Sequence, residues 1–82
     1  MSRYFFDVQD DYGEAVDAEG LEMPSREKAI NEARRAAADL AHEAITQGAA
    51  GPVTIKIRNQ GSRVNVTVNW SVQEMRDDPL SD

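Results

Sequence analysis

The chain has 82 residues, no cysteine and a net charge of −6. This length fits one domain, and the lack of cysteine excludes disulfides, thiolate zinc sites and a cysteine nucleophile, which suits a reducing cytoplasm. The acidity argues against a nucleic-acid partner, because nucleic-acid-binding domains normally carry a basic surface. No apolar stretch approaches the roughly 20 residues of a membrane-spanning helix, and Asp7 interrupts the first apolar run. We therefore expect a cytoplasmic protein without a signal peptide or a membrane partner.

The N-terminal residues 3–8 alternate as a β-strand does. Tyr4, Phe6 and Val8 share the face that we expect to point inward, so Phe5 falls on the outer face. A single exposed apolar side chain is ordinary, and a contact with a partner is the alternative interpretation. A short second strand at residues 15–18 is expected to return beside the first, after which Leu21 and Met23 point inward.

Residues 7–22 hold seven acidic side chains and no basic one. The spacing does not fit an EF-hand loop, because neither glycine of the segment has an oxygen ligand five positions before it. Solvated turn residues are therefore the expected interpretation. A looser divalent-cation site on Asp7, Asp10 and Asp11 stays open as the alternative.

A helix is predicted from Ser25 to about Gln47. Ser25 is a good N-cap residue, and Gly48 is a common helix stop. The apolar positions repeat with helical spacing and are mostly alanine. The helix can therefore lie close to a sheet, while Ile30, Leu40 and Ile45 supply the bulk.

The stretch from Val53 to Val72 alternates β-branched and polar residues around a glycine-containing turn, which predicts a β-hairpin. Keeping every apolar residue on one face centres the turn on Gln60-Gly61. The predicted inner pairs are Ile57 with Val64, Ile55 with Val66 and Val53 with Val68, and the predicted outer pairs are Thr54 with Thr67, Lys56 with Asn65 and Arg58 with Arg63. Trp70 follows the inner row, so we assign it to the core.

Chemical motifs are scarce in this sequence. His42, the one histidine, falls on the polar helix face, and no serine lies in a nucleophile-elbow context. We therefore expect no enzyme activity, no catalytic residue, no cofactor and no metal site. Three bases, Lys56, Arg58 and Arg63, lie on the outer face of the hairpin in a segment without acids.

Part of the sequence resembles a known family. Arg3-Tyr4-Phe5-Phe6-Asp7-Val8, then Asp11-x-Gly13, Asp17-x-Glu19-Gly20 and Pro24, and then the Ala-rich helix, resemble small uncharacterised proteins (a domain of unknown function) common in rhizobia and related alphaproteobacteria. The resemblance reaches about Val72 and implies no site residues. The order of a strand, an acidic turn, a second strand and an Ala-rich helix is also similar in topology to the HicB-type antitoxin core.

Together these patterns predict an α+β domain in the order ββαββ over residues 1–73, with a flexible charged tail at residues 74–82. We expect a mostly antiparallel sheet of three or four strands, with the Ala-rich helix packed on one face. The expected function is a non-catalytic protein–protein interaction or regulatory module, with a second copy or another protein as partner. Its candidate interaction surface is Phe5, Lys56, Arg58 and Arg63. The alternative is an antitoxin-like regulator that binds a toxin or a nucleic acid through the basic outer face of the hairpin.

Overall fold

The computed structural model describes residues 1–77, and the last five residues of the predicted tail lie outside this range. Within the described residues, five strands and one helix follow one another, as β1 (Ser2–Asp10), β2 (Gly13–Ala15), β3 (Leu21–Met23), α1 (Arg26–Thr46), β4 (Val53–Asn59) and β5 (Ser62–Val68). The sheet has the order β2-β1-β4-β5, and β3 pairs with β1. All pairings are antiparallel. The predicted α+β fold is confirmed, with one more short strand than expected.

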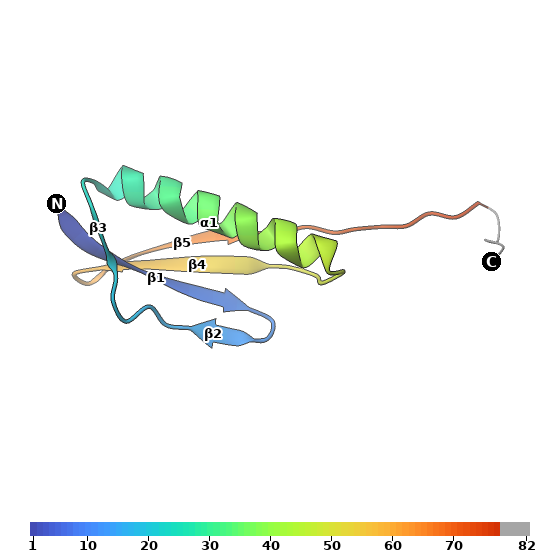
Figure 1. Cartoon of the computed structure of the whole chain (residues 1–82), viewed down its shortest axis with the longest axis horizontal. Helices are drawn as coiled ribbons and strands as arrows, with labels where there is room; N and C mark the ends of the chain where they lie inside the picture. Colours follow the sequence, from blue (N-terminus) through green and yellow to red (C-terminus); the bar gives the residue numbers. More distant parts are fainter. Residues whose placement is uncertain (78–82) are drawn as a thin grey trace.

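The helix covers one face of the sheet and leaves the other face open (Figure 1). Ser25 caps the helix, and its hydroxyl accepts a hydrogen bond from the Lys28 N–H at 3.2 Å. The helix buries a row of four alanines, which are Ala29, Ala33, Ala37 and Ala41. Because these side chains are small, the helix packs closely on Tyr4, Ile55 and Ile57. Ile45, predicted to supply bulk, is 41% exposed because it lies near the helix end.

The hairpin of β4 and β5 has the predicted register. Val53 pairs with Val68, Ile55 with Val66 and Ile57 with Val64. The strand ends at Val68, four residues before the predicted end. Val53 is the first residue of β4, so the residues after Val68 have no strand beside them on that side.

Trp70 differs from the prediction that placed it in the core. Its ring is half-buried outside the main apolar cluster and lies against Gly51, where a Cβ would come within 2.7 Å of the ring. The indole N–H donates to the Ala49 carbonyl oxygen at 3.2 Å. Trp70 therefore attaches the chain after β5 to the linker before β4.

Two predictions for the segment before the helix need correction. The second strand is Gly13–Ala15, earlier than the predicted residues 15–18, because it pairs with the end of β1. Leu21 lies opposite Tyr4, on the helix-covered face as predicted, but it is 49% exposed at the edge of the sheet. Met23 is half-buried and packs against the core as predicted.

Candidate functional site: the outer face of the sheet

The four predicted surface residues lie on the sheet face that the helix leaves open. β4 pairs with β1 so that Arg58 lies opposite Phe5 and Lys56 lies opposite Asp7. Arg58 also lies opposite Arg63 on β5, as predicted. The fold therefore brings the four residues together across β1, β4 and β5, and it places an acidic residue among them.

Asp7 is the buried acid of this face, with only 5% of its surface exposed. Its carboxylate accepts hydrogen bonds from Arg58 Nε at 2.7 Å and from Arg58 Nη2 at 3.1 Å. The second oxygen also accepts from the Asp17 N–H at 2.9 Å. The bonded Arg58 guanidinium lowers the pKa of Asp7 below its usual value of 3.8, although burial acts in the opposite direction. The expectation of a solvated Asp7 was wrong, because its side chain is enclosed by Arg58 and the crossing chain.

Asp17 completes a network with Asp7 and Arg58. Its carboxylate accepts hydrogen bonds from the N–H groups of Phe6, Glu19 and Gly20, at 3.0 to 3.1 Å. The bonds from Gly20 and Phe6 lower the pKa of Asp17. Its carbonyl oxygen accepts from Arg58 Nη2 at 2.9 Å. β2 and β3 pair with the two ends of β1. Between them, the Asp17 side chain accepts the hydrogen bond from the Phe6 N–H that a neighbouring strand would otherwise accept.

Phe5 is half-buried and has its contacts within the chain. The Arg58 guanidinium lies over its ring, 4.9 Å from the centroid, in a cation–π arrangement. Gly20, with a φ of +73°, also approaches this ring so closely that a Cβ would lie 2.9 Å from it. Only glycine fits this position without strain or a clash. Arg58 and Gly20 therefore cover much of the ring that the sequence suggested for a partner.

The other two basic residues differ in their surroundings. Lys56 Nζ lies 2.7 Å from Glu14 Oε2 of β2, in a pair that is about one-third exposed on each side. Arg63 is exposed and forms no ion pair within residues 1–77. Two of the three bases of the predicted basic face are therefore neutralised by acids of the same chain.

The chain matches the family described as Domain of unknown function (DUF6894) over residues 3–70. The protein belongs to this family. The match runs from β1 to Trp70 and so includes the whole network on the outer face of this DUF6894 domain. No curated protein and no solved structure matches the chain.

Asp7 and Asp10 of the DUF6894 domain take part in different hydrogen bonds. Both oxygens of Asp7 are bonded to Arg58, while Asp10 accepts from the Tyr12 N–H at 2.8 Å, as a turn aspartate does. In the described part of the chain, no three His, Asp or Glu side chains form a metal-binding group. Of the cation ligands considered from the sequence, Asp7, Asp10 and Asp11, the first two are thus held in different local arrangements.

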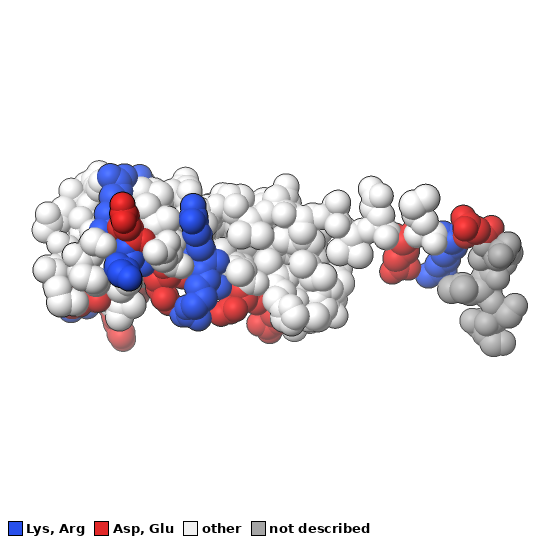
Figure 2. All heavy atoms as spheres, turned by 90° about the horizontal axis from the view of Figure 1, so that it is seen from above, with Lys and Arg blue, Asp and Glu red and all other residues white. Residues whose placement is uncertain are grey.

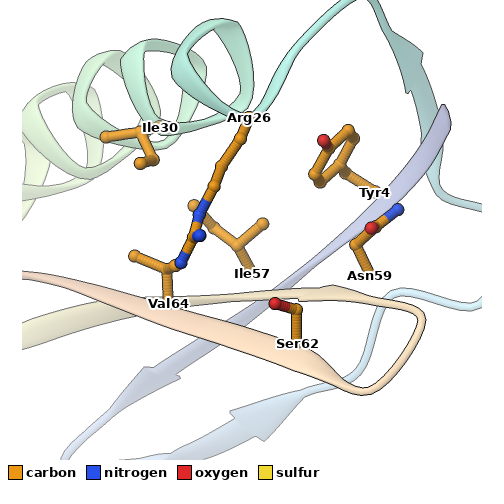
Figure 3. Close-up of a pocket in the computed structure, with 7 residues that line it drawn as sticks. All are labelled: Tyr4, Arg26, Ile30, Ile57, Asn59, Ser62 and Val64. Carbon is orange, nitrogen blue, oxygen red and sulfur yellow. The ribbon is translucent and has the colours of Figure 1, made fainter. Parts of the chain in front are cut away.

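A small hollow lies on the helix-covered face, where the helix begins above the hairpin turn (Figure 3). Tyr4, Ile30, Ile57 and Val64 form its apolar walls, and the Arg26 side chain reaches down into it (Figure 3). Its volume is about 40 Å³. A cavity of this size holds a few water molecules, whereas small-molecule sites usually measure about 300–1,000 Å³.

Larger, open hollows lie beside the C-terminal end of the helix, where Ile45 and Trp70 line one and Tyr12 and Glu43 line another. Within residues 1–77 no hydroxyl or imidazole donates a hydrogen bond to a carboxylate, which is the arrangement of an activated nucleophile. No helix of the described chain is long and apolar enough to cross a membrane.

Sequence reasoning missed Asp7, Asp17 and Glu14 as partners of the basic residues. The one sequence signal for Asp7 was the alternation along β1, which places it on the same outer face as the basic residues. Which strand lies beside β1 is decided by tertiary packing, so Asp7 could not be matched with Arg58 from the sequence.

Proposed function

We propose that this protein is a non-catalytic interaction module of the cytoplasm, which binds an extended segment of its partner at the free edge of β5. The observation that carries the proposal is the asymmetry of the two sheet edges. On the edge away from β4, β1 is lined by β2, Asp17 and β3. The strands β2 and β3 have only three residues each. Short, interrupted edges discourage strand addition.

β5 presents the opposite kind of edge. It has seven residues, no proline, and one neighbour among the described residues, which is β4. The turn residues Gln60 and Gly61 have φ values of 45° and 83°, as in a two-residue hairpin loop of type I′. The flanking pair, Asn59 and Ser62, is hydrogen-bonded in such a turn.

Hydrogen-bonded and non-bonded pairs alternate along an antiparallel ladder. Val64, Val66 and Val68 therefore bond to β4, and the N–H and C=O groups of Arg63, Asn65 and Thr67 point to the free edge. An extended partner segment can bond to these groups as an additional strand. The half-buried side chains of Val64 and Val66 would supply apolar contacts.

The alternative function, a regulator that binds a toxin or a nucleic acid through the basic outer face, has weaker support. Lys56 and Arg58 would have to leave Glu14 and Asp7 before they could bind a phosphate or a carboxylate of a partner. That the protein is related to HicB-type antitoxins, and that its relatives occur in alphaproteobacteria, are proposals that rest on the sequence patterns alone. Nucleic-acid affinity that falls steeply with increasing salt would favour this alternative.

Amide hydrogen exchange of the isolated protein and of its complex with a partner tests the proposal. In the monomer with no partner bound, reached by dilution if the protein self-associates, we expect fast exchange at Arg63, Asn65 and Thr67. Val64 and Val66 should exchange slowly, because their N–H groups bond to β4. In the complex the first three amides should become protected. If they stay unprotected in every complex that the protein forms, the edge is not the binding site.

Asn65→Pro provides the matching variant. It removes a donor that points to the free edge and leaves the β4–β5 hydrogen bonds in place, so the domain should stay folded. Asn65→Ala is its control, because alanine keeps the N–H group. We expect the proline variant to lose the partner and the alanine variant to retain it; equal binding by both would contradict the proposal.

A further inference from the structure

The chain just beyond β5 has the sequence pattern of a strand but is not part of the sheet. Residues 69–73 continue the alternation of polar and apolar side chains, but they lie outside regular secondary structure. Figure 1 shows this segment running on from β5, away from the rest of the molecule. Trp70 attaches the start of the segment to Ala49, whereas Val72 is 65% exposed.

We propose that the partner at the β5 edge is a second copy of this chain, and that the two copies pair residues 64–72 antiparallel about a two-fold axis at Val68. This inference rests on the proposed function, and it adds the identity of the partner and the register. A two-fold axis makes the same segment serve as donor and acceptor in both copies.

The sequence from 64 to 72 is symmetric in its pattern around Val68, as it reads Val-Asn-Val-Thr-Val-Asn-Trp-Ser-Val. With the axis at Val68, Val64 lies opposite Val72 of the second copy, and Val66 lies opposite its Trp70. The polar residues also match, with Asn65 opposite Ser71 and Thr67 opposite Asn69. Every apolar residue of the row then faces an apolar residue, which is how register is specified in a half-buried sheet.

Neighbouring registers lack this match. Moving the axis by one residue toward the turn places Val72 opposite Ser62, and moving it the other way places Val64 opposite Glu74. Both shifts put a polar side chain opposite a valine of the apolar row. The pattern therefore selects Val68 as the centre.

The backbone hydrogen bonds agree with this arrangement. The groups that point to the free edge belong to Arg63, Asn65 and Thr67, and the register places them opposite Gln73, Ser71 and Asn69 of the second copy. All six positions are odd-numbered, so in an extended chain their N–H and C=O groups point to the same edge. The facing groups of the two copies therefore meet as hydrogen-bonded pairs. Val68 then lies opposite Val68 of the second copy, as a pair without backbone hydrogen bonds between them.

The charges permit close approach of the two segments. Residues 64–73 contain no charged side chain. Seen from above the helix, an uncharged zone separates the charges of the domain from those near the end of the described tail (Figure 2). Pairing in this register therefore brings no like charges together within the paired segment. It also places Val72, which is 65% exposed in a single copy, against Val64 of the second copy.

Single cysteines test the register, because the natural chain contains none. The Cα atoms of a non-bonded antiparallel pair are about 4.5 Å apart, within the usual disulfide range of about 4.4–6.8 Å. Under mild oxidation Val68→Cys should form a disulfide-linked dimer. Asn65→Cys and Ser71→Cys should not crosslink alone, but a mixture of the two should give the mixed dimer. Ala38→Cys, on the exposed helix surface, is the control for random collisions.

Light scattering of the wild-type protein gives the second readout, and we expect a dimer at micromolar concentration. Val72→Asp should raise the dissociation constant at least tenfold. It should leave the fold of each copy intact, because Val72 is exposed and lies outside the sheet. A dimer that crosslinks at the helix control as readily as at position 68 would overturn the proposed register.

A protein that stays monomeric at all accessible concentrations would overturn the second-copy proposal. The proposed function would then still be tested separately, because another partner can protect the outward amides of β5. A dimer in which Arg63, Asn65 and Thr67 stay unprotected would also overturn the second-copy proposal. The proposed function fails only if these amides stay unprotected in every complex that the protein forms, so the two failures can be told apart.

Discussion

Replacing Asp7 by alanine tests whether the buried network on the outer face stabilises the fold. The change removes the acceptor of three hydrogen bonds, two from Arg58 and one from the Asp17 N–H. Removing one partner of a fully buried ion pair costs about 3–5 kcal/mol. The Arg58 side chain is 34% exposed and keeps its bond to the Asp17 carbonyl, so it recovers part of its hydration. The unsatisfied Asp17 N–H adds about 1 kcal/mol.

We therefore expect Asp7→Ala to lower the free energy of unfolding by about 2–3 kcal/mol. For a domain of this size the melting temperature should fall by about 10–20 °C. Urea unfolding at pH 7, followed by circular dichroism at one fixed protein concentration, measures the effect. Glu14→Ala, which breaks the more exposed pair with Lys56, is the matched control and should cost less than about 1 kcal/mol. Equal losses for the two variants would refute the assignment of Asp7 as the centre of the network.

Three further predictions concern single groups. Because the folded state lowers the pKa of Asp7 and Asp17, their stabilisation is present above pH about 4 and is lost as the pH falls further; acid titration of Asp7→Asn should show a shallower loss than the wild type. Gly51→Ala places a Cβ 2.7 Å from the Trp70 ring, so the ring should move into water and its fluorescence emission should shift to longer wavelength; an unchanged spectrum would contradict this contact. Ser25→Ala removes the helix cap and should cost about 1 kcal/mol in the same urea assay, with no change in the slope of the transition.

The candidate site could be predicted only in part. Alternation along the hairpin was enough to place Lys56, Arg58 and Arg63 on one face, because successive side chains of a strand point to opposite sides. Alternation does not say which strand lies beside β4. The pairing of β4 with β1 brings Asp7 next to Arg58, and these two residues are far apart in the sequence. Two of the three bases on the predicted basic face are therefore paired with acids of the same chain, Lys56 with Glu14 and Arg58 with Asp7.

The sequence by itself determined the local features of this protein. A glycine turn between two alternating segments specified the register of β4 and β5, and a capping serine with helical spacing of alanines specified α1, because these signals act between near neighbours. Only the tertiary structure decided that the Asp17 side chain bonds to β1 between two short strands, that Arg58 and Gly20 both lie against Phe5, and that β5 is left as the open edge. These features depend on which distant elements share a hydrogen-bonding edge. That choice reflects burial and hydrogen bonding summed over the whole domain, which no short stretch of sequence encodes.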